Sequence, residues 1–540
     1  MTDAAIESTG GGEAPWWRRG VIYQIYPRSF QDTNGDGIGD LPGIVRRLDH
    51  LAWLGVDAVW ISPFYPSPMA DFGYDVTDHC AVDRAYGGIV DFDDIVREAH
   101  ARGIRVIVDY IPNHTSHRHP WFLASRLSRE AERRDWYVWR DPAPDGGPPN
   151  NWVSAFGGSA WTWDAHTRQY YLHTFLREQP DLNWRNPEVV DAMVQVLRFW
   201  LNRGADGVRV DAVQAVIKDE AMRDNPPNPA YVEGRDDPYE RLLREHSTDQ
   251  PGVHEVIARM REVVDGYPGE RVLIGEIYNE VERVMAYYGQ DGRGVHFPYN
   301  FQLIKLPWNA RALEAAVTRY ESLLPEGAWP NWVLGNHDRM RVASRVGPAQ
   351  ARVAAMLLLT LRGTPTVYYG DEIGMRNAVI PPDRVRDPWE LNLPGRGLGR
   401  DPVRTPMQWS AEPNAGFSEA EPWLPLAEDW ERVNVAAQAD EPRSMLALHR
   451  ALLALRRAEP ALALGDWAPV PAAGDVFAYT RTHGQDRLLV ALNLGATPAS
   501  VEIVGTGRLL LSTALDRADE DVQGRLELRG GEGVVVRMEG

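Results

Sequence analysis

The chain has 540 residues, more than one hydrophobic core normally serves, so two or three domains are expected. Its 44% hydrophobic and 25% charged residues are typical of a globular protein, and 76 acidic against 57 basic residues give a net charge of −19. That charge argues against nucleic acid and anionic membranes as partners and is compatible with a neutral ligand.

The amino terminus and the cysteine content indicate where the protein works. Residues 1–14 are polar, Gly-rich and partly acidic, which predicts a disordered tail rather than a signal peptide. No apolar run approaches the ~18 residues that a membrane span needs. The single cysteine, Cys80, excludes an internal disulfide and favours a reducing compartment. We therefore expect a cytoplasmic monomer or homodimer.

From residue 15 onward, strand and helix patterns alternate along the chain. The helical stretches carry apolar residues every three or four positions, as Leu41 to Leu54 does. The predicted strands lie at 21–26, 58–61, 105–109, 207–211 and 272–276, within 297–306, and at 332–334 and 366–370. Eight strand–helix units in series predict an α/β fold, namely a (β/α)₈ TIM barrel.

Three stretches depart from this alternation. Residues 114–181 are rich in Trp, Pro, Gly and Asn, which predicts a subdomain inserted after strand three. The polar, Pro-rich stretch 218–252 is expected to be a long loop or lid. Beyond residue 460, alternating strands and turns predict an antiparallel β-sandwich domain over 460–540. The barrel would then comprise 15–113 and 182–459.

Charged side chains stand where the predicted barrel strands end, and in a barrel all strands end on one face. Strand four ends in Arg209 and Asp211, strand five ends in Glu276, and His337 and Asp338 follow strand seven. A structural salt bridge explains one acidic strand end more readily than it explains three. The set therefore predicts three carboxylates around one pocket.

Carboxylates packed together acquire different pKa values, so one can stay protonated while another is ionised. Glycoside cleavage uses such a pair: an acid for the leaving oxygen and a carboxylate for the anomeric carbon. Arg209 is expected to keep Asp211 ionised, which suits a nucleophile. Glu276 has no adjacent cation in the sequence, which suits a proton donor. A separation of ~5–5.5 Å between the two would imply a covalent intermediate and retention of configuration.

Several segments resemble the signature regions of the α-amylase superfamily, glycoside hydrolase family 13, in the family's order. They are Asp109-Tyr-Ile-Pro-Asn-His114, Gly207-Val-Arg-Val-Asp211, Gly275-Glu276 and Asn336-His-Asp338. Two further segments are similar to motifs of its oligo-1,6-glucosidase and α-glucosidase branch, namely Gln179-Pro-Asp-Leu-Asn183 and Arg404-Thr-Pro-Met-Gln-Trp409.

The resemblance implies Asp211 as nucleophile, Glu276 as acid/base and Asp338 as a stabiliser of the transition state. It also implies substrate contacts from His114, Arg209 and His337, from Tyr74 beneath the sugar ring, and from Phe156 and Phe175 at the pocket mouth. Asp71 is expected to pair with Arg404 and to close the pocket behind one glucose, which makes cleavage exo-acting. Core packing is the alternative interpretation of the two phenylalanines.

Ala212 follows the implied nucleophile, at a position where α-1,6-cleaving members usually carry Val and α-1,4-preferring ones carry Ala or Thr. We therefore expect a retaining, exo-acting α-glucosidase that releases glucose from short α-1,4-glucosides such as maltose through a covalent β-glucosyl-enzyme. Water and acceptor hydroxyls compete for that intermediate, so transglucosylation remains an alternative to hydrolysis.

Other functions were weighed against this one. Within enzymes, the alternatives are an α-glucoside transglucosylase or isomerase and an oligo-1,6-glucosidase. The superfamily's non-catalytic transporter subunits carry a membrane helix and lack carboxylates, and this chain shows neither feature. A phosphosugar hydrolase would need a cationic cluster for the phosphate, and none is evident outside the predicted lid.

The segment Asp32-Thr-Asn34-Gly-Asp36-Gly-Ile38-Gly-Asp40 carries oxygen-bearing side chains at alternate positions, with Gly at the turns. This is the arrangement of a Ca²⁺ loop. The expected ligands are Asp32, Asn34, Asp36, the Ile38 carbonyl and Asp40, around a structural Ca²⁺ that Mg²⁺ could replace. The alternative is an Asx-rich turn that caps the helix beginning at Leu41.

Overall fold

The computed structural model describes residues 14–539, so nearly all of the predicted tail lies outside the described residues. Its largest sheet consists of eight parallel strands: β1 (Ile22–Ile25), β2 (Ala58–Ile61), β3 (Arg105–Tyr110), β7 (Gly207–Val210), β8 (Val272–Glu276), β9 (Phe297–Tyr299), β10 (Asn331–Val333) and β11 (Thr364–Tyr368). They are hydrogen-bonded in the order β10-β11-β1-β2-β3-β7-β8-β9. The end strands β9 and β10 also meet: the backbone N–H of Asn300, directly after β9, donates to Oδ1 of Asn331 in β10 over 3.4 Å. The predicted barrel is confirmed.

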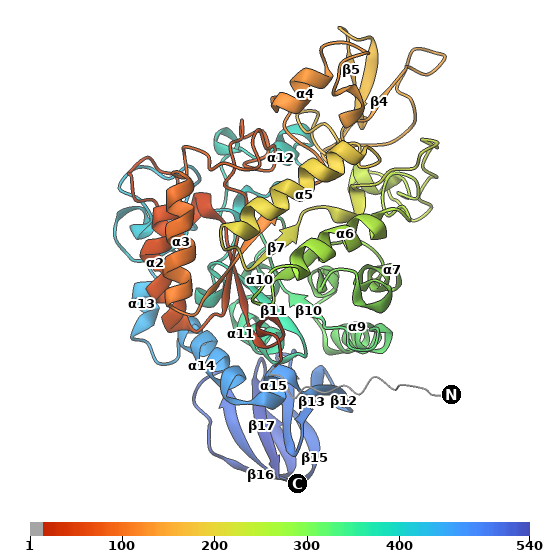
Figure 1. The fold of residues 1–540 in the computed structure, drawn as a ribbon. Helices are drawn as coiled ribbons and strands as arrows, with labels where there is room; N and C mark the ends of the chain where they lie inside the picture. The colour runs from red at the N-terminus through yellow and green to blue at the C-terminus, as the bar shows by residue number, and fades with distance from the viewer. Residues whose placement is uncertain (1–13, 540) are drawn as a thin grey trace, which may run out of the picture.

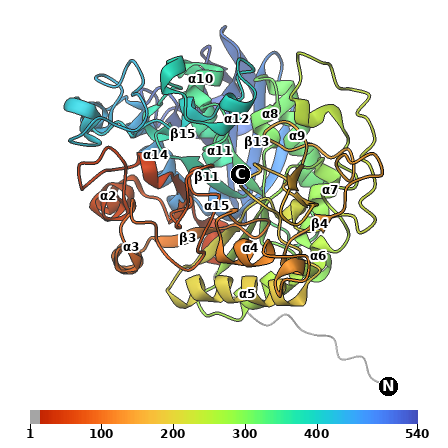
Figure 2. The same ribbon diagram turned by 90° about the horizontal axis from the view of Figure 1, so that it is seen from above.

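Helices surround these strands on the outside (Figures 1 and 2). The principal ones are α2 (Leu41–Leu54), α3 (Ile89–Ala101), α5 (Pro187–Asn202), α6 (Val253–Asp265), α9 (Ala310–Leu323), α11 (Pro348–Thr360) and α14 (Met445–Ala458). Helix α2 has the predicted bounds, and its apolar positions Ile44, Leu48 and Leu51 are fully buried. Helix α11 is apolar nearly all round because it lies between the barrel and the C-terminal sheet.

The chain between β3 and α5 forms the inserted subdomain. It contains α4 (Pro120–Ser125) and a three-stranded antiparallel sheet of β4 (Trp139–Arg140), β6 (Gln169–Leu172) and β5 (Trp161–Asp164). Figure 1 shows it at the end of the barrel opposite the C-terminal sheet. The predicted lid, in the loop after β7, is tied to this subdomain because Asn150 and Trp152 donate to its backbone carbonyls. The insertion and the lid therefore stand together at the carboxyl ends of the strands.

The C-terminal strands are β12 (Asp466–Val470), β13 (Val476–His483), β14 (Asp486–Asn493), β15 (Ala499–Ser512), β16 (Asp521–Leu528) and β17 (Gly533–Glu539). All six are hydrogen-bonded into one antiparallel sheet, where a two-sheet sandwich was expected. The long strand β15 shifts register twice and pairs with both β16 and β17, which keeps the sheet continuous. Phe477 and Tyr479 on one face join the barrel core, and alternate residues on the other face form a separate core.

No helix within residues 14–539 has both the length and the apolar character that crossing a bilayer requires.

Candidate active site

Strand register brings the central charged residues to one level of the barrel. Asp109 on β3 lies in register with Arg209 on β7, and β7 and β8 are aligned so that Asp211 and Glu276 follow side by side. Because side chains alternate along a strand, Arg209 and Asp211 project to the same side. The carboxyl ends of three neighbouring strands therefore supply one charged cluster.

Arg209 is the centre of that cluster and is only 1% exposed. Its Nη1 lies 2.7 Å from Asp109 Oδ1 and 2.7 Å from Asp211 Oδ1, and its Nη2 lies 2.6 Å from Glu276 Oε1. Glu276 has no adjacent cation in the sequence, but the fold supplies one. The two strands stand next to each other, so one guanidinium reaches both carboxylates although 67 positions separate Arg209 from Glu276 in the sequence.

One cation facing three buried carboxylates changes their protonation. Burial raises the pKa of Asp109 to about 6 despite the opposing charge of Arg209. Burial also raises the pKa of Asp211 above its usual range; Arg209 opposes this shift, and the charges of Glu276 and Asp109 add to it. Arg209 favours the ionised form of Asp211, as expected, but its effect on the pKa is smaller than that of burial. Asp109 and Asp211 therefore bind protons more readily than isolated carboxyls do.

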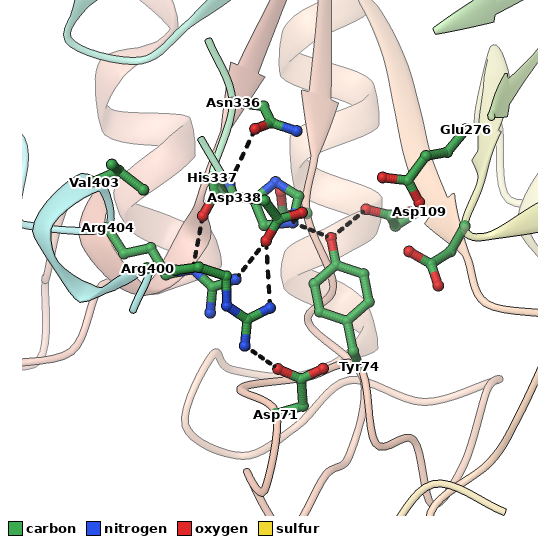
Figure 3. A network of polar contacts seen from close by, with 12 residues as sticks. Asp71, Tyr74, Asp109, Glu276, Asn336, His337, Asp338, Arg400, Val403 and Arg404 are labelled. Carbon is green, nitrogen blue, oxygen red and sulfur yellow. Dashed lines mark hydrogen bonds and ion pairs between the residues drawn. The ribbon is translucent and has the colours of Figure 1, made fainter. Parts of the chain in front are cut away.

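A second network joins Asp338 to the opposite side of the site (Figure 3). Arg404 Nη2 lies 2.8 Å from Asp338 Oδ1, and Arg404 Nε donates to the His337 carbonyl over 2.9 Å. Arg400 Nη1 lies 3.3 Å from Asp338 Oδ1, while its Nη2 lies 2.7 Å from Asp71 Oδ1. The expected pair of Asp71 with Arg404 is therefore wrong, because Arg400 takes that place and Arg404 holds Asp338.

The electrostatic surroundings of Asp338 differ from those of Asp211. Although burial opposes it, the positive charges of Arg400 and Arg404 hold the pKa of Asp338 well below its usual range. Asp338 is thus an ionised carboxylate over the whole physiological pH range, whereas Asp109 and Asp211 bind a proton more readily than free carboxyls do. The site contains both an anion and proton-binding carboxyls, as general acid catalysis requires.

Two buried histidines border these networks in their neutral form. Burial lowers the pKa of His337 to about 3 and that of His114 to about 4. The His337 ring stacks on Tyr74 with an interplanar angle of 3°, and its Nε2 lies 2.7 Å from the Tyr74 hydroxyl. His337 Nδ1 lies 2.8 Å from Gln24 Nε2, so both ring nitrogens are engaged. These contacts fix the orientation of Tyr74 and His337.

The two networks open into a cavity of about 280 Å³. Ten of the predicted site residues line it: Asp71, Tyr74, His114, Phe156, Phe175, Asp211, Ala212, Glu276, His337 and Asp338. Arg209 and Arg404 do not line the cavity but hold carboxylates that do. Phe156 is 4% exposed and packs on Trp389 with ring centroids 5.4 Å apart, so it both packs and lines the wall.

Ala212 has an unusual backbone conformation for its residue type. Its φ of +43° lies in the left-handed region, which is uncommon outside glycine. In that conformation its N–H donates to Glu276 Oε2 over 3.0 Å. The residue after Asp211 thus orients the neighbouring carboxylate, and its small side chain lines the cavity.

The predicted metal loop closes through its own hydrogen bonds. Asp32 accepts from the amides of Asn34, Gly35 and Gly37, and Asp40 accepts from Gly43 N, which caps α2. Among residues 14–539, no group of three or more His, Cys, Asp or Glu side chains is arranged to hold a metal ion. Asp40 therefore has the capping role of the alternative interpretation. The donor set remains chemically suited to Ca²⁺ or Mg²⁺, since it consists of oxygens alone.

Several cavity residues were missed by the sequence prediction: Gln179, Tyr239, Arg244, Tyr278, Lys305, Arg339, Trp389 and Arg400. Gln179 lies in a recognised motif, and Arg400 precedes Arg404 by four positions in the same segment. Either arginine could have been assigned to Asp71 from spacing alone. Most of the others lie in loops without a periodic pattern, where the sequence carries no signal of which side chains face a cavity.

Comparisons with known proteins agree with this geometry. Residues 24–465 match the family described as "Alpha amylase, catalytic domain". A "Probable alpha-glucosidase" of Rhizobium meliloti (strain 1021) is 43% identical over 505 residues, covering 90% of this chain and 91% of that protein. An "Oligo-1,6-glucosidase" of Heyndrickxia coagulans is 37% identical over 530 residues, covering 90% and 93% of the two chains.

A solved structure is also closely similar. The crystal structure of an "alpha-glucosyl transfer enzyme, XgtA" matches with a TM-score of 0.93 and 42% identity, covering 98% of this chain and 100% of that one. The motifs, the barrel and these matches agree, and the chain belongs to the α-amylase family of glycoside hydrolases, family 13.

Proposed function

We propose that the protein is a retaining, exo-acting α-glucosidase that releases glucose from the non-reducing end of short α-glucosides. The observation that carries the proposal is the convergence of Asp211, Glu276 and Asp338 on one cavity of sugar size. The ion pair of Asp71 with Arg400 lines the same cavity and supports a pocket that ends behind a single glucose. Tyr74, with one face stacked on His337, would offer its other face to the sugar ring.

In the proposed mechanism, the Asp211 carboxylate attacks the anomeric carbon while Glu276 gives its proton to the leaving glycosidic oxygen. A covalent β-glucosyl ester on Asp211 results. Glu276 then takes a proton from water, whose oxygen displaces Asp211 and restores the α configuration. Asp338, held ionised by its two arginines, would bind sugar hydroxyls and stabilise the positive charge that develops on the ring.

Replacement of the two reacting carboxylates tests these roles. Asp211→Asn should abolish turnover of 4-nitrophenyl α-glucoside while the thermal transition of the fold stays close to that of the parent. Glu276→Gln should lower the rate of maltose hydrolysis far more than that of an activated aryl glucoside, because maltose has the poorer leaving group. Near-normal activity of Asp211→Asn would refute the nucleophile, and equal losses on both substrates would refute the acid.

The linkage preference is proposed to be α-1,4. The support is the small side chain of Ala212 on the cavity wall beside the two reacting carboxylates. Transfer of glucose to another hydroxyl is the second candidate activity, and the similarity to an α-glucosyl transfer enzyme favours it. Incubation with maltose, isomaltose, sucrose and trehalose distinguishes the two, because hydrolysis yields free glucose and transfer yields rearranged or longer products.

We also propose that the loop from Asp32 to Asp40 takes a structural divalent cation, Ca²⁺ or Mg²⁺. Its five candidate oxygen ligands lie within nine residues, and three of them come from carboxylates. The expected result is a higher thermal transition temperature with 1 mM Ca²⁺ than with EDTA, and no such difference in Asp36→Ala. An equal effect of Ca²⁺ on both proteins would place the cation elsewhere.

A cytoplasmic location is proposed on the single cysteine, which favours a reducing compartment, and the protein is proposed to be a monomer or a homodimer. Light scattering coupled to size-exclusion chromatography measures the oligomeric state directly.

A further inference from the structure

Three positively charged side chains from three different loops line the more exposed part of the cavity, which we call its outer part. Arg244 belongs to the lid after β7, Lys305 ends the short helix α8 (Gln302–Lys305) after β9, and Arg339 follows β10. Arg244 lies over the ring of Tyr239, with its Cζ 4.6 Å from the centroid. Lys305 Nζ and Arg339 Cζ lie 5.6 Å and 5.4 Å from the centroid of Tyr278. Two of the three cations thus share one aromatic side chain.

These cations are held by aromatic rings rather than by carboxylates. Within residues 14–539, none of the three forms an ion pair with an acidic side chain. Two acidic residues, Asp237 and Glu240, line the same cavity, but Asp237 accepts from the Tyr239 amide and caps a short turn. Three cations and two carboxylates thus line this part of the cavity, which leaves an excess of positive charge there in a protein whose net charge is −19.

Charge changes sign along the cavity. Its inner part contains the carboxylates of Asp71, Asp211, Glu276 and Asp338, which outnumber the arginines that hold them. Tyr278, which carries two of the outer cations, lies two residues beyond Glu276. The aglycone, which Glu276 would protonate as it leaves, would accordingly lie in the positively charged outer part of the cavity. A neutral sugar joined to an anionic partner matches this polarity better than a wholly neutral disaccharide does.

The positions of the two lysines in the chain also support recognition of an anionic group. Only two of the 57 basic residues are lysines, Lys218 and Lys305. Lys218 is buried, with its Nζ 2.8 Å from Asp181 Oδ2 and 2.7 Å from Asn113 Oδ1, so its charge is already engaged. Lys305 has no such partner and lines the cavity. A flexible ammonium with three rotatable donors suits a carboxylate or phosphate whose position varies among ligands.

We propose that Lys305, Arg339 and Arg244 form an anion-recognition subsite on the aglycone side of the cavity. The subsite selects α-glucosides, or acceptors of the glucosyl group, that carry a carboxylate or phosphate. This inference rests on the proposed α-glucosidase activity and names the class of aglycone that it prefers. It also revises the expectation that no cationic cluster is evident outside the predicted lid, because Lys305 and Arg339 lie outside that segment.

The test compares pairs of ligands that differ in charge. For donors, the pair is 4-carboxyphenyl α-glucoside and its neutral methyl ester; for acceptors, it is glycerol 3-phosphate and glycerol, with 4-nitrophenyl α-glucoside as donor. Lys305→Gln and Arg339→Gln should each lower the anionic-to-neutral ratio of kcat/KM by about fivefold, the effect of a partly screened ion pair. Lys305→Arg should keep most of the ratio, and 0.5 M NaCl should reduce it in the parent.

Arg311→Gln is the matched control, because Arg311 is an exposed cation at the start of α9 that does not line the cavity. Its ratio should equal that of the parent. Unchanged ratios in Lys305→Gln and Arg339→Gln, or an equal fall in Arg311→Gln, would overturn the subsite. Turnover of the neutral donor separates the two proposals, since its absence refutes the α-glucosidase itself, whereas normal turnover without charge discrimination refutes the subsite alone.

Chemical modification gives a readout that does not depend on the folding of a variant. Acetylation of Lys305, located by mass spectrometry, should lower the anionic-to-neutral ratio as Lys305→Gln does. Reductive methylation keeps the positive charge and should preserve the ratio. The same loss under both treatments would contradict recognition by charge.

Discussion

Arg209 illustrates how one residue can determine the electrostatics of the whole site. Its guanidinium is buried and bonds three carboxylates from three neighbouring strands. Arginine suits this position because its planar fork presents several donors and stays charged when buried. Asp109 and Asp211 share that cation and lie close together, so the protonation of one depends on that of the other.

Removal of Arg209 should therefore destabilise the fold in a pH-dependent way. Arg209→Met leaves buried carboxylates without a counter-charge, which costs about 3–5 kcal/mol of unfolding free energy at pH 7.5. The loss should be smaller at pH 5, because the carboxyls can then be neutral. Urea denaturation at the two pH values measures the difference.

A suitable control is Arg319→Met, which removes a solvent-exposed ion pair with Glu282 and should leave the free energy of unfolding nearly unchanged at both pH values. An equal loss for Arg209→Met at both pH values would contradict the electrostatic explanation.

At the scale of elements, the short helical turn after β11, η7 (Asp371–Ile373), buries a carboxyl group against the first barrel strand. Glu372 is fully buried and accepts from the Tyr23 hydroxyl and from Gly370 N, each over 2.7 Å. Burial raises the pKa of Glu372 to about 7. Between about pH 4 and pH 7 the folded protein therefore holds a proton that the unfolded chain releases.

The contribution of Glu372 to stability is thus complete at low pH and is lost as the pH rises through 7. Glu372→Gln removes this dependence. As the pH rises from 5 to 8, the unfolding free energy of the variant should therefore increase by about 2–3 kcal/mol relative to that of the parent. Chemical denaturation across that range measures the change. Glu326→Gln, at an exposed position, should show no trend, and a constant difference for Glu372→Gln would refute the assigned proton.

At the scale of the molecule, the barrel and the C-terminal sheet share one hydrophobic core. Phe477 and Tyr479 of β13 belong to the same cluster as the barrel residues, and α11 lies between the two parts. Arg481 Nη1 donates to the Thr360 carbonyl over 2.6 Å, and Arg456 Nη1 donates to the Leu359 carbonyl over 3.0 Å. Buried arginines thus satisfy the carbonyls at the end of α11.

These contacts predict that the barrel and the sheet unfold together. Scanning calorimetry should show one transition, and Arg481→Met should lower the temperature of that transition for the whole protein because it leaves a buried carbonyl without its donor. Far-ultraviolet circular dichroism and loss of activity should follow the same curve. Two resolved transitions would show that the C-terminal sheet is an independent unit.

The sequence by itself determined the barrel, the carboxylates at its strand ends and the family. Those features depend on local patterns: the spacing of apolar residues sets each strand and helix, and an acidic residue directly after a strand must stand at the barrel's carboxyl face. For the same reason the sequence alone identifies Asp211, Glu276 and Asp338 as candidate catalytic residues.

Only the tertiary structure decided which charges pair and which remain unpaired. Asp71 bonds Arg400 across 329 positions, Glu276 shares Arg209 with two other carboxylates, and the unpaired cations of the outer cavity come from three separate loops. Such pairings depend on distances between segments remote in the chain. Periodicity within one segment carries no information about those distances, because they are set when the packed strands and loops bring the segments together.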